Sequence, residues 1–487
     1  MLGTWPARRA LISPDRTALV YAGRATTYAQ LADRVARLAS RLRAAGVRPG
    51  DRVAYLGPNH PAFVETMFAT YAAGGVFVPL NFRLAAPEIE YMLEHSGARL
   101  LIHAPSFVVR TAIVTVTLDD YEPWLAAGDD APIGVPATAD DDPACILYTS
   151  GTTGRPKGAV LTHANIVWNT YNLLVGVDVA GDEVTLASAP LFHVATLNQC
   201  LLPTFLKGGC SVIMPGWDVD GCLDAIERHR ITLMFGVTSM YAALAASPRW
   251  PTADLGSIRR LLTGGTSVPS ALIELYQKRG LTFCQGYGMT ETAPGATFLD
   301  APESVSHPGS AGAPVFFTDV RCVRPDLSDT EPGEPGEVLV RGPNVTPGYW
   351  NDPAATRDAF TDGWFRSGDV AVVGPDGHYR IVDRIKDMYI SGGENVYPAE
   401  VEAVLFDHPA VAEAAVVGVP DETWGETGRA FLVPAPGRRV DAAEIRAFLE
   451  LRLARYKIPR YLDVVGELPR TASNKVRKSA LRAAPLP

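Results

Sequence analysis

The chain has 487 residues, of which 47% are hydrophobic and 20% charged, and its formal net charge is −9. This length exceeds what one hydrophobic core usually serves, so we expect two or more domains. The acidic balance argues against a general nucleic-acid binder, because phosphate backbones are bound by an excess of positive charge. It leaves small anionic ligands open, since these need only local donors.

Six cysteines are scattered along the chain without a CxxC pair or a zinc-like cluster. Together with the lack of a recognisable signal peptide, they favour buried thiols in a reducing cytoplasm. The most apolar stretch, 62–80, is interrupted by Glu65 and a Gly-Gly pair, whereas a membrane span needs about 20 nearly uninterrupted apolar residues. We therefore expect a cytoplasmic protein without a transmembrane segment. Peripheral membrane contact and the oligomeric state stay open, a homodimer included.

The first 240 residues alternate helical and strand patterns. Thr27 and Gln30 match a capping box before apolar residues at helical spacing, and Gly46 ends that helix. The next expected elements are a strand at 53–56, a helix at 61–73, a strand at 76–79, a helix at 87–96 and a strand at 100–103. Strands separated by helices indicate parallel βαβ units whose sheet is covered on both faces.

Beyond Gly309 the pattern changes to shorter strands with Gly/Pro turns, such as the strand expected at 337–340, which indicates a β-rich subdomain. After about residue 386 a compact α+β pattern begins, with a helix at 400–406, a strand at 414–418 and a helix at 443–453. We therefore predict an α/β fold. Its large N-terminal domain, residues 1–385, holds two parallel-sheet βα subdomains and the β-rich subdomain, and a small α+β domain follows at 386–487.

A loop rich in hydroxyls and glycines follows a short apolar strand at 146–148. Its residues are Thr149, Ser150, Gly151, Thr152, Thr153 and Gly154, with Lys157 close behind. Such a loop can wrap polyphosphate oxygens with N–H and O–H groups, while Lys157 adds a point charge. The Walker A spacing is absent. We expect a strand–loop–helix context, which favours a phosphate site over a flexible linker.

This loop resembles the phosphate-binding signature of the adenylate-forming superfamily of acyl- and aryl-CoA synthetases, nonribosomal adenylation domains and luciferases. Further segments follow in that family's order and spacing, namely 286–291 (GYGMTE), 364–369 (WFRSGD), 383–387 (DRIKD), 391–398 (SGGENVYP) and 469–475 (PRTASNK). The resemblance covers essentially the whole chain. It implies an ATP-dependent carboxylate:CoA ligase that works through an acyl-adenylate, with Mg²⁺ as cofactor and coenzyme A as co-substrate.

The resemblance also implies how the nucleotide is held. Thr290 and Glu291 supply hard oxygen ligands, which suit a Mg²⁺ shared with the ATP phosphates. Tyr287 offers a flat face for adenine beside two small residues. The remaining ATP-binding residues that the family pattern implies are Gly264, Gly265, Gln285, Gly286, Asp369 and Arg384, with Asp369 accepting both ribose hydroxyls and Arg384 reaching the same sugar or a phosphate.

The same pattern places the catalytic lysine at Lys475, where a mobile cation would neutralise charge between the attacking carboxylate and the α-phosphate. The preceding residue is usually Gly in the family but is Asn474 here. Asn tolerates left-handed backbone angles, so catalysis should survive, although regulation by acetyltransferases that read a Gly-Lys pair is put in question. The family rotates its small domain about a hinge, which maps to Lys386. Rotation brings the CoA-binding segment to the site, here Ser391, Gly392 and Gly393.

The segment 190–198 resembles the family region with a gating histidine, here His193, and the start of the acyl pocket. The pocket residues implied by matching are Val194, Ala195, Asn198, Phe235, Gly236, Val237, Gly288, Met289 and Ala293, and none is charged. Amino-acid-activating relatives hold an Asp near this histidine, and malonate ligases hold a cation. Neither is present, so we expect an acid that is mostly apolar away from its carboxylate.

Several stretches resemble actinobacterial feruloyl-CoA synthetases, among them 52–61, 78–83 and 285–294. Asn198 could hydrogen-bond a phenolic hydroxyl from beside an otherwise apolar pocket. We therefore favour a feruloyl- or 4-hydroxycinnamoyl-CoA synthetase. The alternatives are a medium- or long-chain fatty acyl-CoA synthetase, of which mycobacterial examples share 391–398, and an enzyme that loads an acyl carrier protein.

Overall fold

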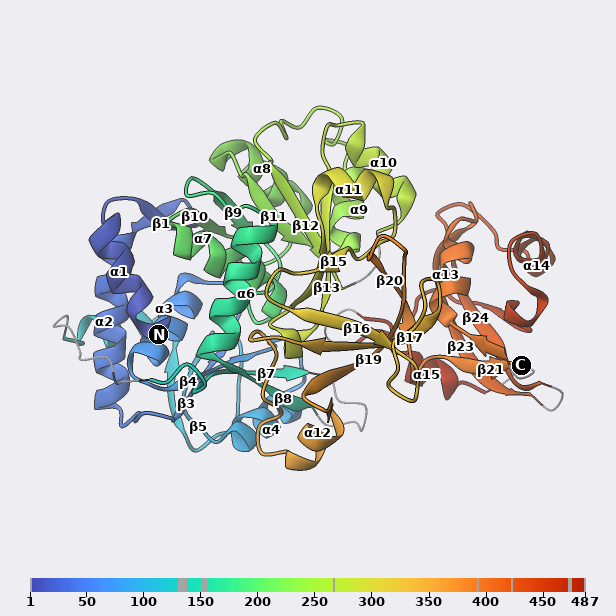
Figure 1. The fold of residues 1–487 in the computed structure, drawn as a ribbon. Helices are drawn as coiled ribbons and strands as arrows, with labels where there is room; N and C mark the ends of the chain where they lie inside the picture. Colours follow the sequence, from blue (N-terminus) through green and yellow to red (C-terminus); the bar gives the residue numbers. More distant parts are fainter. Residues whose placement is uncertain are drawn as a thin grey trace. The chain divides into compact units, whose positions relative to one another are not determined.

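The computed structural model describes residues 2–129, 136, 138–149, 156–265, 268–391, 394–421, 424–471 and 475–485. The chain forms two compact units, which are Met1–Val320 with Val340–Phe365, and Arg321–Leu339 with Arg366–Pro487 (Figure 1). The domain boundary expected at 385/386 stays a prediction. No helix within the described ranges is long and apolar enough to cross a membrane.

The first sheet of unit 1 has the strand order β6–β5–β3–β4–β7–β8. Its strands are β3 (Arg52–Leu56), β4 (Val76–Leu80), β5 (Ala98–His103), β6 (Val114–Thr117), β7 (Pro143–Thr149) and β8 (Lys157–Thr162). The helices of this region are α1 (Trp5–Ile12), α2 (Tyr28–Ala44), α3 (Pro61–Ala72), α4 (Ala86–Ser96) and α5 (Leu118–Ala126). Helix α2 begins at the predicted capping box, because Thr27 and Gln30 each bond the other's backbone N–H, at 3.2 and 2.9 Å. The expected strands and helices up to residue 103 are confirmed.

The context expected for the loop after β7 is wrong. The residues that follow it form strand β8, which pairs antiparallel with β7 and places Thr149 opposite Lys157. Helix α6 (His163–Gly176) begins only after β8, at a capping box formed by Thr162 and Asn165. Residues 158–162 are all buried, and their backbone bonds β7 on one side and residues 348–350 on the other, although β8 is an edge strand of the sheet. The loop residues Ser150, Gly151, Thr152, Thr153 and Gly154 lie outside the described residues.

The second sheet of unit 1 has the order β15–β14–β13–β12–β11–β9–β10–β1–β2. Its strands are β1 (Thr17–Tyr21), β2 (Arg24–Thr27), β9 (Val184–Ala187), β10 (Cys210–Ile213), β11 (Leu233–Gly236), β12 (Arg260–Gly264), β13 (Phe283–Gly288), β14 (Gly295–Leu299) and β15 (Ala313–Pro314). The strands from β1 to β13 in this order run parallel, and the outer ones antiparallel.

Helices cover both faces of this sheet (Figure 1). One face packs against α8 (Val219–His229), α9 (Thr238–Ala246) and α10 (Ser270–Gln277). The other packs against α6 and a single π-helical segment, η2 (Thr196–Leu201), which continues into α7 (Leu202–Lys207). A short helix, α11 (Ala301–Ser306), follows β14. Two parallel-sheet layers with helices on their faces confirm the predicted architecture of the large N-terminal region.

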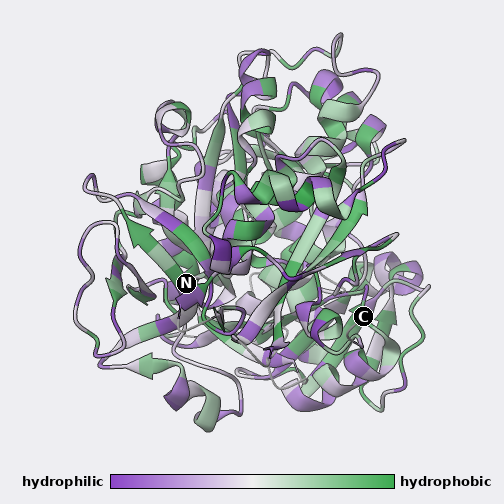
Figure 2. Ribbon diagram, turned by 90° about the vertical axis from the view of Figure 1, so that its right-hand side faces the viewer, coloured by the Kyte–Doolittle hydropathy of each residue, from purple (hydrophilic) through white to green (hydrophobic). Residues whose placement is uncertain are grey.

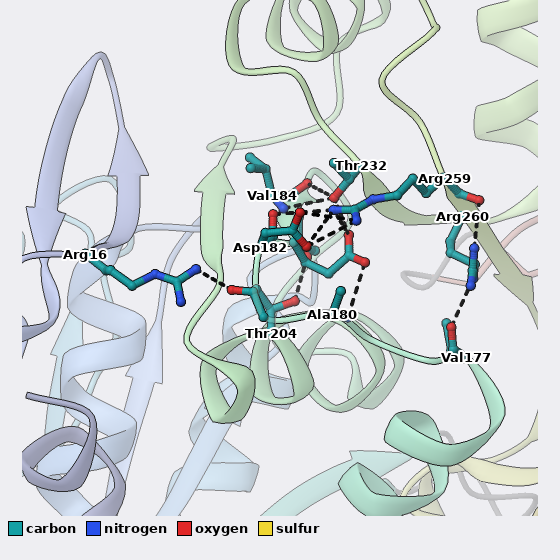
Figure 3. Close-up of polar contacts among 12 residues, drawn as sticks. Arg16, Val177, Ala180, Asp182, Val184, Thr204, Thr232, Arg259 and Arg260 are labelled. Atoms are coloured by element: carbon teal, nitrogen blue, oxygen red, sulfur yellow. Dashed lines mark hydrogen bonds and ion pairs between the residues drawn. The ribbon is translucent and has the colours of Figure 1, made fainter. Parts of the chain in front are cut away.

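A buried polar network ties the amino-terminal ends of β9, β11 and β12 (Figure 3). Glu183, just before β9, is 2% exposed, and its carboxylate accepts the Thr232 hydroxyl and lies 3.4 Å from Arg259. Thr232 also accepts the N–H of Val184 at 2.9 Å. Arg259 pairs in addition with Asp182, at 3.1 Å. These groups satisfy one another at the end of the sheet opposite the carboxyl ends of the strands, so we assign them to stability.

Replacing Glu183 with Ala should lower the free energy of unfolding by about 2–4 kcal/mol, because a buried charge partner is removed. Asp182→Ala is the matched control, since it removes a 75% exposed partner of the same arginine and should lower the free energy of unfolding far less than Glu183→Ala. Urea unfolding curves of the two variants measure both changes. Equal losses would mean that Glu183 is not the buried anchor of this network.

A third sheet has the order β16–β17–β19–β18, with β20 beside β19. Its strands are β16 (Asp319–Val323), β17 (Pro335–Arg341), β18 (Phe360–Thr361), β19 (Trp364–Val373) and β20 (Tyr379–Arg384), with α12 (Pro353–Asp358) between β17 and β18. The fourth sheet contains β21 (Tyr389–Ser391), β22 (Glu394–Val396), β23 (Val411–Asp421), β24 (Gly425–Pro434) and β25 (Tyr461–Val464). It encloses its own apolar core with α13 (Pro398–Phe406) and α14 (Ala442–Glu450), and α15 (Lys478–Arg482) packs nearby. The β-rich and α+β patterns are therefore confirmed.

The six cysteines are free thiols, five of them buried and Cys210 half-buried. Burial raises the pKa of Cys222 and of Cys284 to about 12, so both stay protonated near neutral pH. They belong to the apolar interior, which Figure 2 shows as the hydrophobic strands of the sheets.

Candidate active site

Three side chains from distant parts of unit 1 meet at the start of β8. The Tyr349 hydroxyl donates to Glu291 Oε1 at 2.9 Å. The Lys157 ammonium lies 5.3 Å from the centroid of the same tyrosine ring. Burial, followed by the Glu291 carboxylate, raises the pKa of Tyr349 far above its ordinary value, so this hydroxyl remains a donor. The predicted phosphate lysine and metal carboxylate are thus brought together by a tyrosine.

Backbone bonds hold this arrangement in place. The Thr346 N–H donates to the Glu291 carbonyl at 2.7 Å, and the Trp350 N–H donates to the Gly158 carbonyl at 2.7 Å. Tyr349 itself forms a β-bridge with Ala159 of β8. The segment 346–350 therefore connects the strand that carries Lys157 to the turn that carries Glu291.

The turn that carries Glu291 offers ligands suited to a small hard cation. Thr290 and Glu291 occupy one 3₁₀ turn, η3 (Thr290–Thr292), directly after β13, and Glu291 is 9% exposed. Asn344 fixes the chain on both sides by donating to the carbonyls of Thr292 and Gly295, each at 2.7 Å. A hydroxyl and a carboxylate on a fixed turn form an oxygen donor set that fits Mg²⁺ shared with phosphate oxygens.

At the carboxyl ends of β11–β13, side chains alternate between two faces. Strand register places Phe235, Gly264 and Gly286 on the face covered by α6 and η2. A Cβ added to Gly264 would lie 2.8 Å from the Gly286 carbonyl oxygen, so only glycine fits at this point of the sheet floor. Gly265 has a positive φ of 83° and leads out of β12.

Gln285 faces the opposite side of the sheet, next to Thr263 on β12, and Tyr287 continues on that side. Within the described residues, the buried Gln285 Nε2 and Thr263 Oγ1 have no hydrogen-bond partner. Unsatisfied buried polar atoms are rare in folded proteins and call for a ligand or ordered water. This edge therefore offers polar atoms beside the predicted adenine-stacking tyrosine.

The predicted acid-binding residues gather around η2. Asn198 lies within this π-helical turn, is fully buried, and donates from Nδ2 to the Ala293 carbonyl at 3.0 Å. Its Oδ1 is buried and has no partner among the residues that the structure describes. His193 precedes η2, half-buried, with its ring against Phe192. Single π-helical turns occur frequently at functional sites.

The other predicted pocket residues divide between two apolar clusters. Ala195, Phe235 and Val237 belong to the cluster on the α6 and η2 face, whereas Val194 and Ala293 belong to the neighbouring core. Gly236 lies against the ring of Tyr241, where an added Cβ would be 3.0 Å from the ring. Gly288 and Met289 form the turn before η3, and a Cβ on Gly288 would collide with the Pro294 carbonyl.

In unit 2, two predicted nucleotide residues form a cross-strand pair. Asp369 on β19 lies opposite Arg384 on β20, and Arg384 Nε is 3.0 Å from Asp369 Oδ1. Asp369 is 5% exposed, so the arginine holds a carboxylate that is largely withdrawn from water. Partial burial, with the neighbouring Arg384 guanidinium, lowers the pKa of Lys386. Arg482 of α15 pairs with Asp387 at 2.9 Å, just after the predicted hinge.

The remaining predicted residues also lie in unit 2. Ser391 ends β21 and is 3% exposed, while Gly392 and Gly393 lie outside the described residues. Lys475 is exposed. Its backbone N–H donates to the Thr471 hydroxyl at 3.1 Å, and its carbonyl accepts the Thr471 N–H at 2.7 Å. These two bonds connect the backbone of Lys475 to Thr471.

Sequence reasoning missed Tyr349 and Thr346. Both follow β17 in a stretch rich in Pro, Gly and Asn, and their partners lie far away along the chain. A Gly-Tyr pair after the strand expected at 337–340 was the available signal, but it does not indicate which groups the tyrosine contacts.

Family models and individual relatives match most of this chain. The family model for AMP-binding enzymes matches residues 7–350, and the model for the C-terminal domain of AMP-binding enzymes matches residues 400–475. A feruloyl-CoA synthase from an Amycolatopsis species is 54% identical over 484 residues, which cover 99% of this chain and 98% of that protein. A long-chain-fatty-acid–CoA ligase from Mycobacterium tuberculosis is 37% identical over 497 residues, covering 99% and 98%.

The o-succinylbenzoate CoA synthetase from Bacillus subtilis provides solved structures for comparison. Its complex with an acyl-adenylate intermediate superposes with a TM-score of 0.92 at 36% identity, covering 99% of this chain and 98% of that one. Its complex with ATP and a magnesium ion gives a TM-score of 0.90 at 35% identity, covering 98% and 99%. The chain therefore belongs to the AMP-binding enzyme family and is an acid–thiol ligase of that family.

Proposed function

We propose that this ligase converts hydroxycinnamic acids, with ferulate and 4-hydroxycinnamate as the preferred substrates, into their CoA thioesters. The observation that carries the choice of acid is the buried Asn198 Oδ1, an acceptor without a partner in the described part of the chain. A phenolic hydroxyl would satisfy it. The 54% identity to a feruloyl-CoA synthase supports the same choice.

The glycine floor suits a planar acid. Gly264 and Gly286 leave space beside Phe235 on the same face of the sheet, where a flat ring can lie against the backbone. No charged residue belongs to the predicted pocket, so the acid is neutral away from its carboxylate. A rigid, conjugated acid also loses little conformational freedom on binding.

The proposed reaction has two steps. The acid's carboxylate oxygen attacks the α-phosphorus of ATP, and pyrophosphate leaves, which gives the acyl-adenylate. The CoA thiol, losing its proton, then attacks the acyl carbonyl carbon, and AMP leaves. Bound Mg²⁺ supplies charge neutralisation at the phosphate oxygens.

Each group has an assigned task. Thr149, the loop 150–154 and Lys157 bind the polyphosphate, Asp369 orients the ribose, and Lys475 neutralises charge at the α-phosphate in the first step. Thr290 and Glu291 would hold the metal. Lys386 serves as the hinge between the two steps, and Ser391 with Gly392 and Gly393 admits the pantetheine arm.

Two alternatives are less well supported. The fatty acyl ligase is the more distant relative, at 37% identity, and a long flexible chain would leave Asn198 Oδ1 unsatisfied. A carrier-loading enzyme would use the same pantetheine thiol, so saturation by free CoA within the usual micromolar to millimolar range tests it. Comparison of kcat/KM for ferulate, 4-coumarate, octanoate and palmitate tests the acid. Preference for either fatty acid over both cinnamates would overturn the proposal.

Asn198→Leu should lower kcat/KM for 4-hydroxycinnamate by about 10- to 100-fold, because the pocket loses the acceptor for the phenol. The matched substrate is cinnamate, which lacks only that hydroxyl. Any general damage from losing the bond to Ala293 affects both acids alike. A ratio of the two kcat/KM values that stays at the wild-type level would remove Asn198 from substrate recognition.

A further inference from the structure

We propose that Tyr349 is a positioning residue that orients Glu291 toward Mg²⁺–ATP and at the same time seats Lys157 for the phosphates. The proposal deepens the proposed function, on whose ATP site it rests. It assigns a task to a side chain that none of the sequence motifs contains.

The two ends of one phenol contact two oppositely charged groups. The hydroxyl donates to Glu291 Oε1 at 2.9 Å, and the ring face lies 5.3 Å from the Lys157 ammonium. A donor fixes which carboxylate oxygen is engaged and so where the other points. The negative face of the ring attracts the ammonium without neutralising it. The lysine therefore keeps its charge for an incoming phosphate.

The backbone around Tyr349 rules out a loose surface contact. Residues 346–350 bond the Glu291 carbonyl on one side and the Gly158 carbonyl on the other, each at 2.7 Å. The Thr346 hydroxyl also donates to the Val160 carbonyl of β8 at 2.5 Å. Because both charged groups are anchored to the segment that carries the tyrosine, the phenol sets their mutual separation.

Two substitutions separate the two contacts. Tyr349→Phe removes the hydroxyl and keeps the ring, whereas Tyr349→Leu removes both. The measurement is calorimetric titration of the full chain with Mg²⁺–ATP and, separately, with ATP in excess EDTA. Tyr349→Phe should weaken Mg²⁺–ATP binding by about tenfold or more, and metal-free ATP by less than about threefold, since only the metal carboxylate loses a bond. Tyr349→Leu should weaken both forms. Tyr171→Phe, on the exposed surface of α6, is the control and should change neither.

A double-mutant cycle with Glu291→Gln provides the second readout. If Tyr349 acts through the carboxylate, adding Tyr349→Phe to Glu291→Gln should weaken Mg²⁺–ATP by less than about threefold further. Equal weakening of both nucleotide forms by Tyr349→Phe, or full additivity with Glu291→Gln, would overturn the proposal and leave the tyrosine a purely structural group. The titrations contain neither acid nor CoA, so an error in the proposed acid cannot produce either result.

Discussion

Lys475→Ala should reduce acid-dependent ATP–pyrophosphate exchange by about 100- to 1000-fold, the cost of removing one preorganised charge from a phosphoryl or acyl transition state. Lys475 is exposed, and its backbone forms two hydrogen bonds with Thr471. Thioester formation from supplied acyl-adenylate should change by less than about threefold, because no charge then develops at an attacked phosphate.

Adenylate formation and thioester formation are measured separately in Lys475→Ala, and the difference between them tests the role of Lys475. Lys278→Ala removes another exposed lysine and should leave both halves at the wild-type rate. Rapid-quench measurement of each half separates a chemical defect from a folding defect, since a misfolded enzyme loses both. Equal loss of the two halves in Lys475→Ala would contradict the assignment.

Asp369→Asn should lower kcat/KM for ATP by about 100-fold, because the ribose loses a charged acceptor and Arg384 loses its anion. The cross-strand pair at 3.0 Å holds the carboxylate in one orientation. KM for the acid should stay near its wild-type value in steady-state assays, since the substitution lies on β19 and not among the predicted pocket residues.

Asp362→Asn is the matched control for this variant. Asp362 is exposed, lies in the turn before β19 and has a positive φ of 48°, which Asn tolerates. Its kcat/KM for ATP should be unchanged. A loss in Asp369→Asn confined to KM for the acid, with ATP unaffected, would remove Asp369 from the nucleotide site.

Local signals predicted local structure well. The capping box at Thr27 and Gln30 started α2 where expected, and alternating apolar runs located β3, β4 and β5. The helix expected to follow the loop at 149–157 was wrong at this point of the chain. Residues Lys157–Thr162 form strand β8 because they pair with β7 and are buried, and both are tertiary effects.

The chemistry of the site was readable only in part. Lys157 and Glu291 could be predicted from their motifs. Their contacts with Tyr349 depend on the β-bridge between Tyr349 and β8 and on the hydrogen bond to the η3 turn, and residue spacing along the sequence does not predict such long-range contacts. The same holds for Asn198, whose residue type suggested a phenol contact. The π-helical turn places its amide so that it donates to the Ala293 carbonyl. The Oδ1 atom then has no partner among the described residues.

We propose that hydroxycinnamates are activated as adenylates before CoA reacts. A two-stage single-turnover experiment tests this order of steps. Ferulate and Mg²⁺–ATP are mixed with excess enzyme in the absence of CoA, and CoA is added after the first phase. We expect one feruloyl-adenylate and one pyrophosphate per active site, followed by stoichiometric feruloyl-CoA and AMP after CoA is added. Release of ADP and phosphate, or pyrophosphate formation that does not depend on ferulate, would contradict it.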